Sequence, residues 1–257
     1  MSLVNSDNQA PIHNPRRISV VIPARNEEEG IGRVLCRIAE EPVWETIVAD
    51  GGSTDRTRDV ARSLGARVVA APIGRGRQIS AGARSATGDA LLFLHADTLL
   101  PPSFSRHISD TLNKPGVSGG AFLLGIDRPG ARFRMIETLA NARSRWFSRP
   151  YGDQAIFVDR GVFDRIGGFP ELPVMEDVAF IRLLKKLGRV EMAPVAVSTS
   201  ARRWLENGVV LTTVHNQLCL FAYVVGVSPE RIARWRGRGD VHDRKPNHSV
   251  NLSETRT

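Results

Sequence analysis

Strand-like and helix-like segments alternate through the first part of this chain, and this alternation most constrains its fold. Short apolar segments of strand type are followed by longer segments with the spacing of amphipathic helices. The expected strands are 18–23, 46–49, 67–70 and 90–94, and the expected helices are 27–40, 55–64 and 77–86. Strands connected through helices form a parallel sheet with helices on its faces. The sequence therefore predicts an α/β fold with a single, mainly parallel central sheet.

The strand at 90–94 is apolar throughout and leads directly into His95 and Asp97. A continuous apolar run is typical of a strand that is buried on both faces. In open α/β sheets, ligands bind just beyond the carboxyl ends of the strands. A carboxylate at that point can hold a divalent cation, which can in turn hold phosphate oxygens. The alternative is an ordinary turn in which Asp97 caps the next element.

A second acidic residue, Asp50, follows the strand at 46–49 and opens the loop 50–55, whose sequence is Asp-Gly-Gly-Ser-Thr-Asp. Glycines let a backbone approach a ligand closely, and amides at a helix N-terminus favour anions. Asp50 can accept hydrogen bonds from a nucleobase or a ribose. The alternative is a turn in which Ser53 or Asp55 caps the next helix. No glycine fingerprint or P-loop lysine follows the first strand, which argues against common dinucleotide and P-loop chemistry.

Composition limits the classes of protein that the chain can belong to. Its 257 residues suit one large domain or two small ones, with 42% hydrophobic residues and a net charge of +8. Positive charge favours phosphate-bearing ligands, nucleic acid or an anionic membrane surface. There is no zinc-finger spacing and no aromatic-rich basic stripe, so nucleic acid is not an expected partner. The two widely separated cysteines, Cys36 and Cys219, fit a reducing, cytoplasmic compartment, and the polar N-terminus predicts no signal peptide.

The second half of the folded part is less regular. Strands are expected at 119–124 and 155–158, and helices at 131–147 and 176–187. The predicted domain plan has disordered tails at both ends and one folded domain with two halves: tails 1–16 and 237–257, domain 17–236, halves about 17–100 and 101–236.

Residues 209–227 are strongly apolar, but His215, Asn216 and Gln217 interrupt them. The run is marginal in length and polarity for a membrane span. Three interpretations stay open: a membrane-spanning helix, a helix that lies on a membrane or on another subunit, and a packed helix. The polar interruption favours the packed helix.

Several segments, taken in order, resemble the family-2 glycosyltransferases of the GT-A fold. The segments are 21–28 (Val-Ile-Pro-Ala-Arg-Asn-Glu-Glu), 47–55, 87–90, 93–97, 167–170 and 175–177. Together they span roughly residues 17–205. The resemblance implies a Rossmann-like nucleotide-diphospho-sugar transferase fold. It also implies an inverting, hexosyltransferase-like enzyme that transfers a sugar from a nucleotide-diphospho-sugar to a hydroxyl acceptor.

The resemblance also assigns residues to the donor. It places four residues at the nucleoside, Pro23, Asn26, Glu27 and Asp50, and it places Arg77 at the phosphates. The alternative for Arg77 is a solvated charge in a loop.

Asp97 matches the last position of the metal-binding Asp-x-Asp motif of the family, and His95 stands at its first position. Asp97 is therefore the more secure ligand of a Mn²⁺ or Mg²⁺ cofactor. His95 is either a second ligand or a packed side chain.

The pair Glu176–Asp177 matches the catalytic acidic pair of the family, with Asp177 as the base that takes the proton of the acceptor hydroxyl. The alternative is a helix N-terminus that is enriched in acids for its dipole. Arg202 and Arg203 are expected to neutralise the leaving diphosphate, or else to form a basic loop. Ser200 replaces the glutamine of the Gln-x-x-Arg-Trp motif of processive members, which argues against polymer synthesis.

Gly152, Asp153 and Gln154 precede a predicted strand and are a candidate edge of the acceptor site. The segments 74–78, 95–98 and 200–204 also resemble a narrower subgroup labelled arsenosugar-biosynthesis glycosyltransferases. The acceptor is either lipid-linked or soluble. A lipid-linked acceptor would place the protein at the inner face of the membrane, with 209–227 in contact with the membrane surface or with a second copy. Two alternatives remain: a nucleotidyltransferase of similar fold, and a non-catalytic binder of RNA or membranes.

Overall fold

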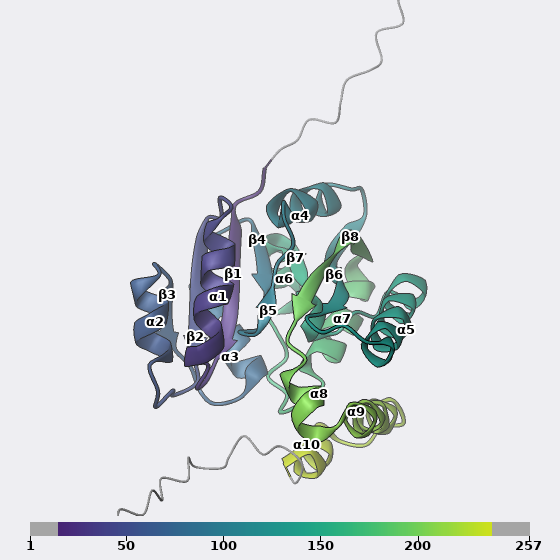
Figure 1. The fold of residues 1–257 in the computed structure, drawn as a ribbon. Coiled ribbons are helices and arrows are strands. Elements are labelled where there is room, and N and C mark those ends of the chain that lie inside the picture. Colours follow the sequence, from purple (N-terminus) through teal and green to yellow (C-terminus); the bar gives the residue numbers. More distant parts are fainter. Residues whose placement is uncertain (1–14, 238–257) are drawn as a thin grey trace, which may run out of the picture.

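The computed structural model describes residues 15–237 (Figure 1). The first half has four parallel strands with connecting helices. The strands are β1 (Ile18–Ala24), β2 (Glu45–Asp50), β3 (Arg67–Ala70) and β4 (Ala90–Phe93), and the helices are α1 (Glu28–Ala39), α2 (Thr57–Ser63) and α3 (Arg75–Ser85). This arrangement confirms the predicted strand–helix alternation and its parallel sheet.

The second half adds four strands, β5 (Thr98–Leu99), β6 (Val117–Ile126), β7 (Phe157–Asp159) and β8 (Arg189–Thr199). All eight strands of the described region form one sheet in the order β3-β2-β1-β4-β7-β6-β8-β5. Strand β7 runs antiparallel to both of its neighbours, and β5 runs antiparallel to β8, while β6 and β8 are parallel. The sheet is therefore parallel in its first half and mixed in its second half.

Helices of the second half surround this mixed part of the sheet. They are α4 (Phe104–Leu112), α5 (Ala131–Phe147), a 3₁₀ turn η1 (Gly152–Gln154), α6 (Arg160–Ile166), α7 (Glu176–Leu187), α8 (Arg202–Asn207), α9 (Val209–Val224) and α10 (Pro229–Gly237). The predicted helices at 131–147 and 176–187 coincide with α5 and α7. Within the described range no helix is both long enough and apolar enough to cross a membrane.

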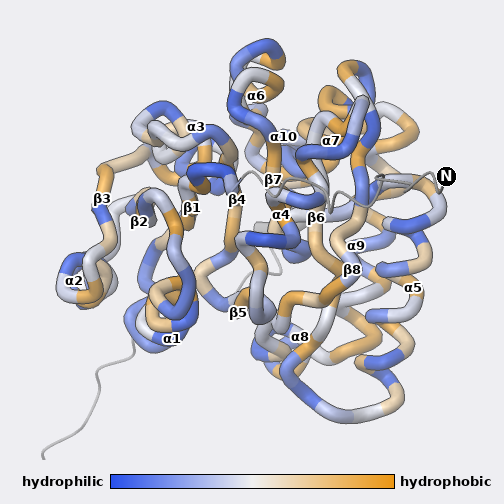
Figure 2. Tube along the Cα trace, turned by 90° about the horizontal axis from the view of Figure 1, so that it is seen from above, coloured by the Kyte–Doolittle hydropathy of each residue, from blue (hydrophilic) through white to orange (hydrophobic). Residues whose placement is uncertain are grey.

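The two faces of the sheet carry separate hydrophobic clusters, which explains why β4 is apolar throughout and why Ser19 is the one polar residue of β1. Ile18, Val20 and Ile22 of β1 belong to the cluster that includes α1 and α4. Val21 points to the opposite face, where it packs in the cluster that includes α3, α6 and α7. Figure 2 shows α1 on one side of the strands and α3 and α7 on the other. Burial on both faces leaves the carboxyl ends of the strands as the place where polar side chains can gather.

The described range also bears on the predicted tails. Residues 1–14 and 238–257 lie outside it. Arg16, which the sequence analysis placed in the N-terminal tail, forms an ion pair with Asp159 at the start of α6. Helix α10 ends at Gly237, and the predicted boundaries of the domain and its tails stay a prediction.

Candidate active site

Two adjoining cavities lie where β1 and β4 end. The rim cavity, of about 300 Å³, is lined by Pro23, Ala24, Arg25, Glu27, Arg75, Gln78, His95, Ala96, Asp97, Arg202 and Arg203. The central cavity, of about 200 Å³, is lined by Arg75, His95, Asp97, Tyr151, Asp153, Met175, Asp177, Val178, Thr199, Ser200, Arg203, Trp204, Thr212, Asn216 and Leu220. Four charged or titratable residues, Arg75, His95, Asp97 and Arg203, line both cavities, so the two cavities are continuous at this point.

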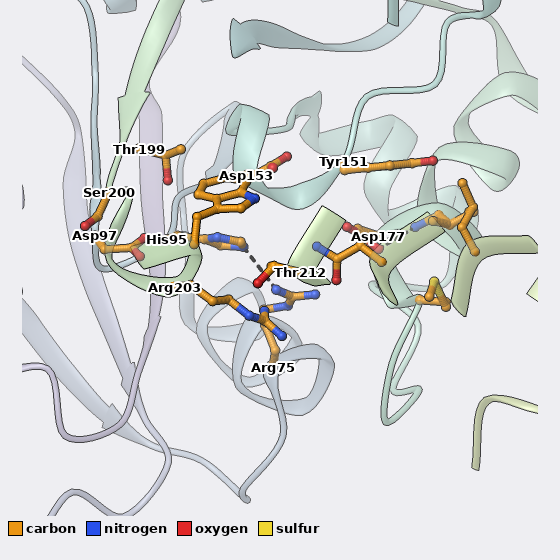
Figure 3. A pocket seen from close by; sticks show the side chains of 15 residues that line it. Arg75, His95, Asp97, Tyr151, Asp153, Asp177, Thr199, Ser200, Arg203 and Thr212 are labelled. Carbon is orange, nitrogen blue, oxygen red and sulfur yellow. Dashed lines mark hydrogen bonds between the residues drawn. The ribbon is translucent and has the colours of Figure 1, made fainter. Parts of the chain in front are cut away.

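Asp97 and Asp177 face the same cavity although they are distant in sequence. Asp97 follows β4, whereas Asp177 lies in the first turn of α7. Figure 3 shows the two carboxylates toward opposite ends of the central cavity, with His95 and Arg75 between them. One acidic group at the end of the parallel strands therefore faces another that a helix in the second half supplies.

His95 and Asp97 are the residues that the resemblance assigns to a metal ion. Burial is the main cause that lowers the pKa of His95, to about 4, and the charge of Arg75 lowers it further. The ring is therefore neutral at physiological pH, which is the form that binds metals. Across residues 15–237 there is no cluster of three or more His, Cys, Asp or Glu side chains placed to hold a metal ion. This pair alone would therefore leave most of the coordination of a cation to other ligands.

Arg75 pairs with one acidic group of the site and lies near a second. Its guanidinium forms an ion pair with Glu176, and its Nη1 lies 3.5 Å from His95 Nε2. Burial lowers the pKa of Arg75, but the negative charges of Glu176 and Asp177 outweigh burial and raise it. The side chain of Glu176 is only 2% exposed. Glu176 therefore holds Arg75 at the base of the site, and Asp177 is the member of the acidic pair that faces the central cavity.

The carboxylate of Asp177 is fixed by two backbone amides. Oδ2 accepts a hydrogen bond from Gly152 N at 2.8 Å, and Oδ1 accepts one from Val178 N at 2.8 Å. A Cβ on Gly152 would lie 3.1 Å from His95 Nε2 and 3.3 Å from Asp177 Oδ2. Gly152 therefore permits the close approach between η1 and the acidic group, and the hydrogen bonds leave lone pairs of the carboxylate for a ligand.

The three residues predicted at the acceptor edge have different environments. Asp153 lines the central cavity, and its Oδ1 is buried without a hydrogen-bond partner among the described residues. Burial raises the pKa of Asp153 to about 6. Gln154 is fully buried, accepts a hydrogen bond from Ser144 Oγ and donates one to the Phe122 carbonyl. Gln154 therefore anchors the turn, and Asp153 is the side chain that is available to a ligand.

Of the four residues predicted at the nucleoside, two line the rim cavity and two hold the loops beside it. Pro23 and Glu27 line the rim cavity, whereas Asn26 and Asp50 do not. Asn26 Oδ1 accepts a hydrogen bond from Thr54 N, and Asp50 accepts hydrogen bonds from Gly52 N and from Ser53. Asn26 and Asp50 therefore stabilise the loops after β1 and β2. Of the two predicted caps of α2, Asp55 accepts a hydrogen bond from Thr57 N and Ser53 accepts one from Asn26 N, while Arg56 occupies the N-cap position.

The basic residues around the rim cavity differ from the predicted set at one position, where Arg75 stands in place of Arg77. Arg202 and Arg203 line the rim cavity as expected, and Arg202 pairs with Glu27 at 3.1 Å. Arg77 is exposed and lines neither cavity, while Arg75 lines both. Residues two apart on a helix face opposite directions. Arg75 shares a face with the buried Ile79 one turn later, and this spacing was the sequence signal that could have identified it.

Helix α9 contributes residues that sequence reasoning did not assign to the site. Thr212, Asn216 and Leu220 recur every four residues and line the central cavity. The stretch 209–227 therefore packs over the site through one helix face. Asn216, one of the three polar residues that interrupt the apolar run, lies on that face together with Thr212.

The comparisons with known proteins agree with this geometry. Residues 19–170 match the family model described as Glycosyl transferase family 2. The chain belongs to this family. Family membership favours glycosyl transfer over the nucleotidyltransferase and non-catalytic alternatives.

Curated relatives of this family match only parts of the chain. The chain is 34% identical over 107 residues to the 4,4'-diaponeurosporenoate glycosyltransferase of Staphylococcus haemolyticus. This match covers 38% of this chain and 28% of the relative. The chain is 49% identical over 57 residues to the enzyme of the same name from Staphylococcus aureus, and this match covers 22% of this chain and 15% of the relative. The match therefore spans less than a third of each of these relatives.

Solved structures of glycosyltransferases share the fold. One is the mannosyltransferase PcManGT from Pyrobaculum calidifontis in complex with GDP-Man and Mn²⁺, with a TM-score of 0.58, 21% identity, and coverage of 72% of this chain and 57% of that one. Another is glucosyl-3-phosphoglycerate synthase from Mycobacterium tuberculosis in complex with Mn²⁺ and UDP-glucose, with a TM-score of 0.54, 25% identity, and coverage of 72% and 70%. These neighbours confirm the GT-A glycosyltransferase fold.

Proposed function

We propose that this chain is an inverting, metal-assisted glycosyltransferase that moves a sugar from a nucleotide-diphospho-sugar to a hydroxyl acceptor. The observation that carries the proposal is that Asp97 and Asp177 line one cavity. One carboxylate lies where a donor diphosphate and its cation would bind, and the other lies where an acceptor would approach. The domain that does this is the predicted one, 17–236, with a donor half and an acceptor half.

The rim cavity suits the nucleotide part of the donor. Pro23 and Glu27 line it at the end of β1, and Arg75, Arg202 and Arg203 supply positive charge. Positive side chains at the diphosphate stabilise the negative charge that develops when it leaves. Asn26 and Asp50 act on this site by fixing the two loops beside it. Arg77 has no part in this proposal.

The residues present fit a divalent cation that is bound together with the donor. Asp97 offers a carboxylate and His95 a neutral imidazole at the junction of the two cavities. Mg²⁺ commonly binds to one or two carboxylates and to substrate phosphates, so a site with few protein ligands is suitable. When bound, the ion supplies Lewis-acid stabilisation of the leaving diphosphate.

Asp177 is the proposed base. As the acceptor oxygen attacks the anomeric carbon, its proton passes to Asp177, and the bond from that carbon to the diphosphate breaks. The electron pair of that bond leaves with the nucleoside diphosphate. A single displacement from the face opposite the leaving group inverts the anomeric configuration. The amides of Gly152 and Val178 hold the carboxylate in position for this transfer.

The names of similar proteins indicate which donors to test first. The solved neighbours carry GDP-Man and UDP-glucose, so hexosyl donors with guanine or uracil are our first candidates. The arsenosugar label of the resembling subgroup stays a prediction, since the curated relatives are named for 4,4'-diaponeurosporenoate.

A peripheral position at the inner face of a membrane, with 209–227 in contact with the membrane or with a second copy, also stays a prediction. It is supported by the apolar side chains that α9 exposes, which include Leu211, Leu218 and Phe221.

The proposal is tested by binding and by product stereochemistry. A panel of nucleotide-sugars, with and without Mn²⁺, should contain a donor that raises the melting temperature, and Asp97→Asn should remove the Mn²⁺-dependent part of that shift. Asp59→Asn, on the exposed surface of α2, is the matched control. A product with the anomeric configuration of the donor, determined by NMR, would refute the inverting mechanism.

A further inference from the structure

A third cavity, of about 570 Å³, lies beside the central cavity between α5, α7 and α9. Apolar side chains form most of its wall: Phe147, Pro150, Val178, Ile181, Leu220 and Val224. We call it the apolar cavity. Its volume is that of a small-molecule site, and the donor chemistry described above makes no use of it.

Five cations surround the apolar cavity, and no acidic residue lines it. They are Arg143, Arg149, Arg182, Lys185 and Lys186. Within residues 15–237, none of them forms an ion pair with a carboxylate. Aromatic rings hold two of them, since Arg143 lies over Tyr151 and Arg182 lies over Tyr223. Arg143 also acts electrostatically on Asp153 of the central cavity, but no carboxylate of the described residues forms an ion pair with these cations or lines the apolar cavity, which favours a ligand that is apolar and anionic.

The apolar cavity adjoins the central cavity through a shared wall. Tyr151, Val178 and Leu220 line both cavities. Figure 3 shows Tyr151 close to Asp153 and Asp177. A molecule in the apolar cavity can therefore place one end beside the proposed base.

The charged residues at the two ends of α7 determine how a molecule in the apolar cavity would be oriented. Asp177 lies in the first turn of α7, and Lys185 and Lys186 lie in its last turn. The distance along the axis between Asp177 and Lys186 is about 13 Å at the rise of an α-helix. An acceptor along α7 would thus meet the base at one end and positive charge at the other.

We propose that the apolar cavity holds the acceptor, and that the acceptor is an amphiphile whose apolar chain has a hydroxyl at one end and an acidic group toward the other. This inference rests on the proposed function and names the acceptor class of that site. The chain lies along α7, its hydroxyl reaches Asp177, and its acidic group lies at Lys185 and Lys186. Val224, which lines the apolar cavity, is also half-exposed on α9, so the cavity wall reaches the surface at this residue.

The test uses linear ω-hydroxy carboxylates of increasing chain length as probes, below the concentration at which they form micelles. Binding to the full chain is measured by calorimetry. Each added methylene should tighten binding, up to about fourfold while the cavity fills. Diols of the same length should bind more weakly, and ω-hydroxy alkyl ammonium ions more weakly still. Equal binding of all three classes, or no dependence on chain length, would overturn the proposal.

Two neighbouring residues provide a matched pair of variants. Val224 lines the apolar cavity and Val225 does not, although both side chains are more than half exposed. Val224→Glu should weaken binding of the longest carboxylate by about tenfold or more, because it places a negative charge in the apolar wall. Val225→Glu should leave binding within twofold. Equal losses in the two variants would contradict the proposal.

Two further measurements separate this inference from its alternatives. The first is binding of the protein to anionic vesicles. If Val224→Glu and Val225→Glu weaken vesicle binding equally and the monomeric probes do not bind, then α9 docks to a membrane and the cavity proposal is overturned. Nucleotide-sugar binding is measured in parallel by thermal shift. Donor binding without probe binding refutes the acceptor class alone, whereas loss of both refutes the proposed function.

Discussion

The two halves of the sheet bring side chains to the site by different means. In the first half, Pro23 is the penultimate residue of β1 and Asp97 lies in the loop after β4, so the carboxyl ends of parallel strands place both residues. In the second half, Asp153 comes from a 3₁₀ turn, Asp177 from the first turn of a helix, and Thr212 from the face of another helix. The first means is a general property of parallel sheets, whereas the second depends on how particular helices pack.

Backbone conformation shows the same contrast. In the first half, Asn26 is the only described residue other than glycine with positive φ, and asparagine tolerates this region. In the second half, two residues other than glycine have positive φ next to site residues: Ala155 follows η1, and Met175 precedes Glu176 and Asp177. Such conformations cost free energy, and they persist only where the surrounding packing offsets that cost. Met175 packs with Cys219, Ala222 and Ile232 of α9 and α10, so the C-terminal helices stabilise the strained start of α7.

The largest expected effect separates chemistry from donor binding. Asp177→Asn should reduce transfer about 10²- to 10⁴-fold, because the amide cannot accept the acceptor proton. Donor affinity should change less than twofold, since Asp177 does not line the rim cavity. Steady-state transfer and donor titration are measured together, with Asp59→Asn as the control. Transfer at the wild-type rate would remove Asp177 from the mechanism.

The next prediction tests whether the second half depends on the packing of α10. Ile232 is fully buried against Met175, and Ile232→Ala should destabilise this region by about 2–4 kcal/mol. Transfer should fall while donor binding persists. The variant is compared with Val225→Ala, an exposed position in the same region, by hydrogen exchange of α7 and by donor titration. If donor binding falls in parallel with transfer, the two halves are not independent.

The contrast also explains how far the sequence predicted the site. The parallel strands, the order of the first helices, and the positions of Asp97 and Pro23 follow from apolar runs and from the rule for strand ends. Arg75, and not the predicted Arg77, lines the cavities, because Arg75 lies on the face of α3 that points to the sheet and the motif carries no information on that face. Gln154 was expected at the acceptor edge, but its burial depends on contacts with Ser144 and Phe122. The apolar cavity involves three helices distant in sequence, and no local pattern reveals it.

A smaller effect concerns the pH dependence of stability in the second half. The pKa of Asp153 is raised to about 6, above its ordinary value of about 4 in an unfolded chain. The folded state therefore binds more protons between these values, and this group makes the protein less stable as pH rises from about 4 to 6. Asp153→Asn should remove a penalty of roughly 3 kcal/mol at pH 7 and of about 0.5 kcal/mol at pH 4. Urea unfolding of the metal-free protein at both pH values measures the difference, and an equal effect at the two pH values would contradict it.

The smallest expected effect concerns two arginines on one helix of the first half. Arg77→Ala should change donor affinity and the free energy of unfolding by less than about 0.5 kcal/mol, because Arg77 is exposed and lines neither cavity. Arg75→Ala leaves Glu176 buried without its cation, so it should lower stability by about 2 kcal/mol and weaken donor binding. Donor titration and urea unfolding of both variants make the comparison. A larger loss of donor affinity in Arg77→Ala than in Arg75→Ala would mean that α3 presents its other face to the donor, and the strand-end account of the first half would then need a different position for this helix.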